Sequence, residues 1–247
     1  MKKKRDEVRY NKNEKLFFKS LKLSNKNLRI VENFPAYLTP NYFRKLLIRY
    51  EAYKLTKHIP GSIFECGVGN GSGFFSWIHF KELFEPFNHN KKIIGFDTFK
   101  GFPNVSKQDF GQIKNKNIKK GGLNYNNYNE MKILLNARKK IYPLNHLDQF
   151  KLIKGNATLT IKNYLKKNPQ TFISILYLDF DNYIPTLRTL ENTKKNMSKG
   201  SIICFDELDH AFWPGEGRAI KKFFNNLNKI KIQKFDLGGS PGFYRVE

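Results

Sequence analysis

Three acidic residues, Asp179, Asp206 and Glu207, stand at the ends of two apolar runs that have the composition of buried strands. In neighbouring strands of a parallel sheet, about 5 Å apart, their carboxylates would meet at one rim. Such carboxylates repel and raise one another's pKa, a conflict that a hard divalent cation such as Mg²⁺ relieves with oxygen ligation. The ion could hold two substrate hydroxyls and lower the pKa of one. The alternative is that these acids are solvated or cap helices.

A glycine-rich turn, residues 65–73, follows the first of the predicted strands. Its glycines let the backbone approach a ligand, and the next helix offers free N–H groups. The spacing matches neither a P-loop nor the dinucleotide G-x-G-x-x-G pattern. With Glu65 before it and Asp97 closing the next strand, the turn predicts a site for S-adenosylmethionine, although such turns also occur without a cofactor. Glu65 would lie near the cofactor's amino-acid end, and Asp97 would accept from both ribose hydroxyls. The glycines expected along its methionine and ribose are Gly67, Gly69 and Gly71.

Other polar residues follow the same predicted strands. Asn156, after the third strand, is expected at the adenine edge of the cofactor. Asp181 is expected to cap the helix that begins near Ile184. His146, in the segment 98–147, and His210, beyond the apolar run at 201–206, are candidate general bases, because histidine titrates near neutral pH. For any single histidine a structural or surface role is the commoner outcome.

The elements that must position these residues alternate between strand and helix. Apolar, nearly non-alternating runs predict strands at 62–68, 92–97, 150–153, 171–179, 201–206, 230–236 and 242–246. Helical spacing fills most of the intervals, from 39 to 59, 72 to 83, 158 to 167, 184 to 197 and 216 to 227. This alternation predicts an α/β fold, a Rossmann-like, doubly wound and mostly parallel seven-stranded sheet with helices on both faces. Cys66 and Cys204 would lie two strands apart, beyond disulfide reach, as core thiols.

Two segments stand apart from that alternation. Residues 1–38 are predicted to be a basic N-terminal arm or helical extension, before a domain at 39–247 that holds the predicted S-adenosylmethionine site. Residues 98–147 form a long insertion rich in Asn, Lys, Gly and Tyr, with a helix near 129–142. Because it leaves from the carboxyl end of a strand, where ligands bind in such sheets, we expect a lid or substrate insertion.

The net charge of +24, from 45 Lys and Arg against 21 Asp and Glu, suggests nucleic acid as a partner. The excess is mainly lysine scattered along the chain, whereas nucleic-acid readers depend more on arginine. We therefore expect a generally solvated basic surface. The alternative is a surface suited to an anionic small substrate or an acidic membrane. No apolar run is long enough for a membrane span and no signal peptide is visible, which favours a cytoplasmic protein. A homo-oligomer remains open.

Four segments together resemble the macrocin/mycinamicin sugar O-methyltransferases, the TylF/MycF group. They are Glu65-Cys66-Gly67-Val68-Gly69-Asn70-Gly71, Phe96-Asp97-Thr98-Phe99-Lys100-Gly101-Phe102-Pro103, Leu178-Asp179-Phe180-Asp181 and Phe205-Asp206-Glu207. The resemblance implies a class I, S-adenosylmethionine-dependent enzyme that methylates a deoxysugar hydroxyl with Mg²⁺ assistance. It places the metal on Asp179, Asp206 and Glu207, with Asp179 also the general base; Glu207 stands where the family commonly has Asp.

The resemblance also extends to residues 213–217, a loop expected to wall the sugar site, although Pro214 and Glu216 equally signal a helix start. The substrate would be a nucleotide-linked sugar or a glycoside, and a pyrophosphate would suit the lysine-rich insertion. The alternatives are an RNA methyltransferase that uses the basic surface and a non-catalytic Rossmann-like binding protein. The first is disfavoured because Asp179-Phe180-Asp181-Asn182 replaces the Asn/Asp-Pro-Pro-Tyr/Phe motif of that class.

Overall fold

The computed structural model of the chain describes residues 12, 15–19, 21 and 25–247. Much of the predicted N-terminal arm therefore lies outside the described residues. Its last part forms two short helices, α2 (Asn25–Glu32) and α3 (Phe34–Tyr37). No helix within the described ranges is long and apolar enough to cross a membrane.

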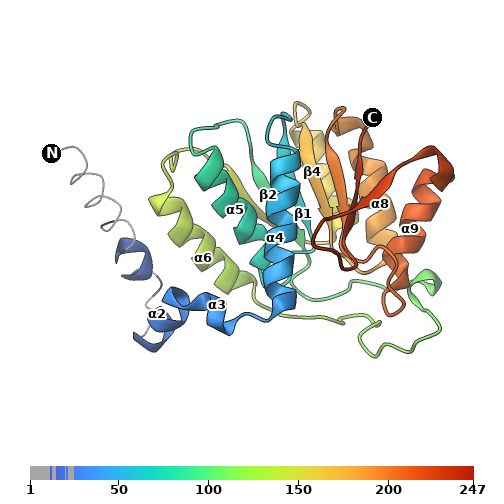
Figure 1. Cartoon of the computed structure of the whole chain (residues 1–247), viewed down its shortest axis with the longest axis horizontal. Helices are drawn as coiled ribbons and strands as arrows, with labels where there is room; N and C mark the ends of the chain where they lie inside the picture. The colour runs from blue at the N-terminus through green and yellow to red at the C-terminus, as the bar shows by residue number, and fades with distance from the viewer. Residues whose placement is uncertain (1–11, 13–14, 20, 22–24) are drawn as a thin grey trace.

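The centre of the molecule is a sheet of seven strands in the order β3-β2-β1-β4-β5-β7-β6. The strands are β1 (Ser62–Cys66), β2 (Ile93–Asp97), β3 (Phe150–Lys154), β4 (Ile173–Leu178), β5 (Ile202–Phe205), β6 (Ile232–Lys234) and β7 (Gly242–Arg245). Strands β1 to β5 pair in parallel, and β7 runs antiparallel to both β5 and β6 (Figure 1). The predicted mostly parallel, seven-stranded sheet is confirmed.

Helices cover both faces of this sheet, because its central strands are apolar on both sides. One face packs against α4 (Pro40–Leu55), α5 (Ser72–Phe84) and α6 (Tyr128–Ile141). The other packs against α7 (Ala157–Lys167), α8 (Tyr183–Thr193) and α9 (Pro214–Phe224). Cys66 and Cys204 are buried free thiols, as expected.

The order of the strands reverses between β1 and β4, and ligands of such sheets bind outside the carboxyl ends at that point. Gly67 shows how closely the two strand ends approach. Its φ is 95°, and a Cβ added there would lie 1.9 Å from the carbonyl oxygen of Asp179. Glycine is therefore required by both backbone conformation and space, and the glycine turn and Asp179 form one compact unit.

The insertion at 98–147 has two parts. Residues up to Asn127 are largely irregular, with one short 3-10 turn at Lys107–Asp109, and several of them line the cavity described below. The second part holds α6, whose buried Met131 and Leu135 join the core, so this helix belongs to the layer beside the sheet. The cavity-lining part of the insertion is thus confined to its first thirty or so residues.

Candidate functional site

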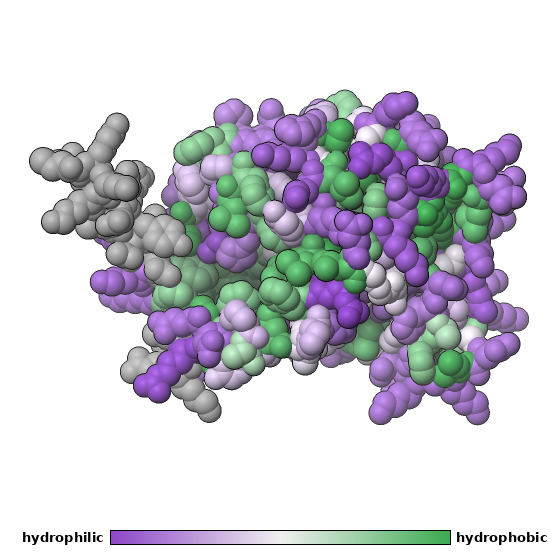
Figure 2. Space-filling model, viewed as in Figure 1, coloured by the Kyte–Doolittle hydropathy of each residue, from purple (hydrophilic) through white to green (hydrophobic). Residues whose placement is uncertain are grey.

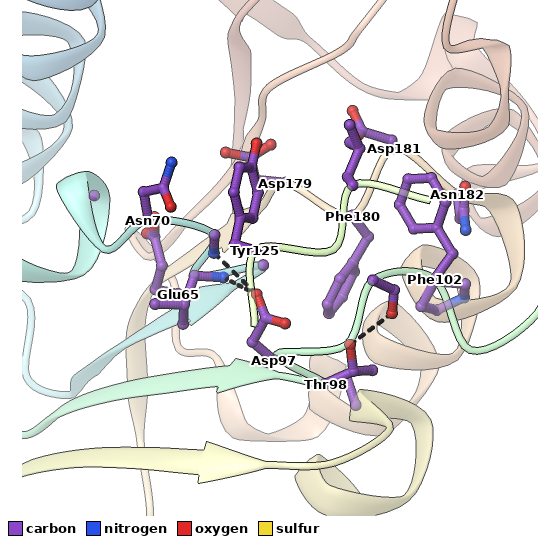
Figure 3. Close-up of a pocket in the computed structure, with 18 of the residues that line it drawn as sticks. Glu65, Asn70, Asp97, Thr98, Phe102, Tyr125, Asp179, Phe180, Asp181 and Asn182 are labelled. Carbon is purple, nitrogen blue, oxygen red and sulfur yellow. Dashed lines mark hydrogen bonds between the residues drawn. The ribbon is translucent and has the colours of Figure 1, made fainter. Parts of the chain in front are cut away.

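A cavity of about 370 Å³ opens at the carboxyl ends of the parallel strands (Figure 3). It is bounded by the glycine turn, the ends of β2, β3 and β4, the insertion and α4. The predicted site residues that line it are Glu65, Gly67, Gly69, Asp97, Asn156, Asp179 and Glu207. Gly71 and Asp206 lie just outside the lining: Gly71 caps α5, and Asp206 is buried beneath the rim.

Asp97 is engaged by the backbone of the glycine turn. Its Oδ2 accepts hydrogen bonds from the N–H groups of Val68 and Gly69 at 2.8 and 2.9 Å (Figure 3). Its Oδ1 accepts from Phe99 N at 2.6 Å. These bonds hold the turn in shape. A carboxylate has about four acceptor positions, so capacity for a further donor remains. Binding of ribose hydroxyls by Asp97 stays a prediction.

Glu65 lies beneath the turn, in a buried ion pair that the sequence did not reveal. Its Oε1 receives a bond of 2.9 Å from Arg49 Nη2, and its Oε2 one of 2.6 Å from Trp77 Nε1. The Glu65 side chain is 1% exposed. Burial raises its pKa while Arg49 lowers it, since the guanidinium stabilises the charged carboxylate. Glu65 thus fixes the joint between β1, α4 and α5.

Asp179 and Asp206 also face basic side chains from α4. Arg49 Nη2 lies 3.6 Å from Asp179 Oδ2, and Lys45 Nζ lies 2.8 Å from Asp206 Oδ2. Tyr177 donates its hydroxyl to the other Asp206 oxygen at 2.8 Å, and its ring stacks under Arg49, 4.1 Å from the guanidinium carbon. Lys45 and Arg49 are the basic side chains, among the described residues, that line the cavity.

Negative charge nevertheless exceeds positive charge at this rim. Burial, followed by the Asp206 carboxylate, raises the pKa of Asp181 to about 7 and of Glu207 to about 8. The same two causes raise the pKa of Asp179 well above its usual range, against the opposing effect of Lys45. Carboxylates in this state are proton acceptors near neutral pH.

The Mg²⁺ prediction can be compared with the placement of its three carboxylates. The donor chemistry suits a hard cation, and Glu207 Oε2 is a buried oxygen without a hydrogen-bond partner. As placed, however, no three His, Cys, Asp or Glu side chains in the described ranges are arranged to hold a metal ion. Asp206 is turned toward Lys45 and Tyr177, and Glu207 lies 3.6 Å from His210 Nε2. The metal site is therefore not confirmed.

Three other expectations are corrected or refined. Asp181 does not cap α8: the N-cap is Asn182, and Asp181 lines the cavity in a left-handed conformation with φ of 59°. His146 is exposed shortly before β3, at the end of the sheet opposite the cavity, and lies outside the lining, so it is not placed to act as base. His210 contacts Glu207 but does not line the cavity either.

The loop before α9 and the adenine-edge residue are both at the rim. Trp213 lines the cavity, with its ring 6.0 Å from that of Phe102, and Pro214 begins α9, so the helix start is confirmed. The contact of this loop with a sugar stays a prediction. Asn156 caps α7 by accepting from Thr158 N at 3.1 Å, and it also lines the cavity.

Three residues missed by the sequence interpretation complete the site, namely Lys45, Arg49 and Tyr125. Lys45 and Arg49 are one helical turn apart on α4, and Arg49 is buried with Ile48, Ala52 and Tyr53. The sequence signal that could have identified them is a pair of basic residues at positions i and i+4 of a helix, beside its apolar stripe. Tyr125 lies in an irregular stretch without periodicity, and no pattern identified it.

Comparisons with known proteins agree with this geometry. A family model described as "Macrocin-O-methyltransferase (TylF)" matches residues 49–245. The crystal structure of CalS11, a calicheamicin methyltransferase, is similar, with 30% identity, coverage of 96% of this chain and 91% of that chain, and a TM-score of 0.83. An apo structure of CalS11, described as a TDP-rhamnose 3'-O-methyltransferase, gives 29% identity, 96% and 93% coverage, and a TM-score of 0.74.

The O-methyltransferase NovP shares the fold, with 16% identity, 82% and 79% coverage and a TM-score of 0.58. None of the curated proteins compared with the chain matches it.

Proposed function

The chain belongs to the macrocin-O-methyltransferase (TylF) family, and from that premise we propose that it transfers a methyl group from S-adenosylmethionine to a deoxysugar hydroxyl. The observation that carries the proposal is the contact between the glycine turn and Asp179 at Gly67. Because of this contact, the glycine turn, which has the pattern of a cofactor site, and the basic carboxylate of Asp179 lie on the same wall of the cavity. The similarity to CalS11, a TDP-rhamnose 3'-O-methyltransferase, supports a sugar carried on a nucleotide.

The chemistry requires an acceptor oxygen in line with the sulfonium methyl, and a group that takes the hydroxyl proton. We assign that group to Asp179. Its side chain is 27% exposed, at the cavity wall, and its raised pKa makes it a stronger base than an ordinary carboxylate. Lys45 and, less strongly, Arg49 at 3.6 Å lower this pKa, but they do not offset burial and the Asp206 carboxylate. The S–CH₃ bond breaks as the C–O bond forms, and the proton passes to Asp179.

We place the donor along the glycine turn. Gly67 and Gly69 would pass its methionine and ribose, while Gly71, the cap of α5, directs free N–H groups toward it. Asp97 would take the ribose hydroxyls and Asn156 would lie at the adenine edge. Glu65 would act near the amino-acid end through the buried framework it forms with Arg49, rather than as a free carboxylate.

We also propose that a divalent cation, Mg²⁺ or a similar ion, is held by Asp179, Asp206 and Glu207. The excess of carboxylates and the unpartnered Glu207 oxygen support it. When bound, such an ion lowers the pKa of a coordinated hydroxyl. Lys45 occupies one oxygen of Asp206 and so competes for the same carboxylate.

The phosphates of a nucleotide-linked sugar would not contact lysines of the insertion inside the cavity. Within the described residues, none of the insertion's lysines lines the cavity, although the insertion carries several. The pyrophosphate would therefore remain at or beyond the mouth, where exposed lysines can approach it without a fixed contact.

The test is methyl transfer from labelled S-adenosylmethionine to TDP-rhamnose and to simple rhamnosides, with the product identified by its mass. We expect one added methyl per sugar. Chelation with EDTA should abolish transfer and added Mg²⁺ should restore it. Full activity after chelation would remove the metal from the proposal while leaving Asp179 as base. Methyl incorporation into RNA instead of any sugar would contradict the proposed substrate class.

A further inference from the structure

Residues 121–127, which we call the strap, contribute Leu123 and Tyr125 to the lining of the cavity and are tied at both ends. At one end Phe102 N donates to Gly122 O at 3.0 Å and Gly121 N to Phe102 O at 2.8 Å. At the other, Asn127 Nδ2 donates to Gly69 O at 3.0 Å and to Asn70 Oδ1 at 3.2 Å. The second tie fastens the strap directly to the glycine turn.

Two residues of the strap hold left-handed backbone conformations, Leu123 with φ of 52° and Asn126 with φ of 48°. Asparagine adopts this conformation readily, but it is unfavourable for leucine. It persists where the surrounding contacts determine the path of the chain. Those contacts here are the two ties, and the effect is to fix the residue between them, Tyr125.

The Tyr125 ring stands over the glycine turn and beside the carboxylates. A Cβ added at Gly69 would lie 3.6 Å from its Cε2 atom, an ordinary packing distance. Figure 3 shows the ring rising from above Asp97 toward Asp179. Partial burial, and then Asp181 and Asp179, raise the pKa of Tyr125, consistent with a phenol that faces both carboxylates. The side chain keeps 49% exposure, so it forms part of the cavity wall that a ligand can touch.

We propose that Tyr125 is a further residue of the transfer site, with its ring against the sulfonium end of the donor and its hydroxyl on the acceptor. This rests on the proposed methyl transfer. An aromatic face within about 6 Å attracts a cation, and the sulfonium is cationic only before transfer. The phenol can donate a hydrogen bond to the acceptor oxygen beside Asp179. This bond would hold the acceptor hydroxyl in one position that suits both attack on the methyl group and proton removal by Asp179. Tyr125 keeps its own proton throughout.

Two substitutions separate the two roles. Tyr125→Ala removes ring and hydroxyl, and it should weaken S-adenosylmethionine binding by roughly 3- to 10-fold more than S-adenosylhomocysteine binding, since only the first ligand is cationic. Tyr125→Phe keeps the ring, so the ratio of the two affinities should stay that of the wild type while kcat/KM for TDP-rhamnose falls. Calorimetry with both ligands and a transfer assay provide the readouts. Tyr37→Ala, at a tyrosine 63% exposed and outside the cavity lining, is the matched control.

The ratio of donor to product affinity is a readout that a merely structural role would not move. An unchanged ratio in Tyr125→Ala would overturn the ring's role, and wild-type kcat/KM in Tyr125→Phe would overturn the hydroxyl's role. If the wild-type protein binds S-adenosylmethionine but methylates no sugar, the proposed acceptor fails. The affinity ratio still decides the ring's role in that case.

Discussion

Replacing Arg49 by methionine tests whether the buried pair with Glu65 organises the site. The Arg49 and Glu65 side chains are 6% and 1% exposed, and their contact distance is 2.9 Å. Methionine removes the positive charge but fills much of the same space beside Tyr177. Glu65 would then be a buried carboxylate with Trp77 as its remaining hydrogen-bond donor.

Breaking a buried pair in this way costs about 3–5 kcal/mol of unfolding free energy, because the remaining charge is left uncompensated. For a chain of this size, each kcal/mol corresponds to about 2–4 °C, so Tm should fall by about 6–20 °C. Without Arg49, burial acts unopposed by that cation and the pKa of Glu65 rises further. The loss should therefore be larger at pH 8 than at pH 5, where Glu65 is more readily protonated.

The assay is urea unfolding followed by tryptophan fluorescence, for which the buried Trp77 is a local reporter. Glu65→Gln alone and the double variant Arg49→Met/Glu65→Gln complete a cycle, with Arg49→Lys as the conservative control. The double variant should recover a large part of the loss, since it removes both charges. A loss below about 1 kcal/mol in Arg49→Met, or a double variant equal to the sum of the single variants, would refute this account of the pair.

Three further expectations concern the rim. Gly67→Ala should lower Tm and prevent S-adenosylhomocysteine binding, as its Cβ would meet the Asp179 backbone; wild-type affinity would contradict this. Stability should fall as pH rises between about 4 and 8, because raised pKa values let Asp181 and Glu207 hold more protons when folded than unfolded. Denaturant titrations should show that stability depends less steeply on pH in Glu207→Gln. An unchanged pH dependence would exclude Glu207 as one of its causes. Asp109→Ala should raise the KM for the acceptor by a larger factor than the KM for the donor, since Asp109 accepts hydrogen bonds from both Ser106 N and Tyr183 N beside the cavity. An equal change in the two KM values would contradict this expectation.

The sheet and its helices could be predicted because their signals are local. The apolar run at 171–179 contains β4, whose residues Ile173–Leu178 are all buried, and a turn such as 65–73 needs glycine for its backbone. The family resemblance added Asp206 and Glu207 as the expected partners of Asp179 in a metal site. Element ends moved by only a few residues, as at α8, which begins at Tyr183 and ends at Thr193.

The rest of the site could not be predicted because it depends on contacts between distant segments. Nothing local says that Lys45 reaches Asp206, 161 residues away, or that Asn127 fastens the insertion to Gly69. The expected cap at Asp181 was wrong because Asn182, one residue later, takes the N-cap position and frees Asp181 for the cavity wall.

The high net charge proved the least specific of these signals. Figure 2 shows hydrophilic side chains spread over much of one face, with hydrophobic patches between them. Around the cavity the balance reverses, since five acidic side chains line it against two basic ones, Lys45 and Arg49. The five acids are Glu65, Asp97, Asp179, Asp181 and Glu207.

The central claim, that Asp179 removes the acceptor proton in a methyl transfer to a sugar, is tested most directly by Asp179→Asn. Single-turnover transfer from labelled S-adenosylmethionine to TDP-rhamnose would be measured beside calorimetric binding of S-adenosylhomocysteine. The account predicts that transfer falls by at least about 100-fold, the usual contribution of a general base, with product affinity nearly unchanged. Transfer at the wild-type rate in this variant would contradict it.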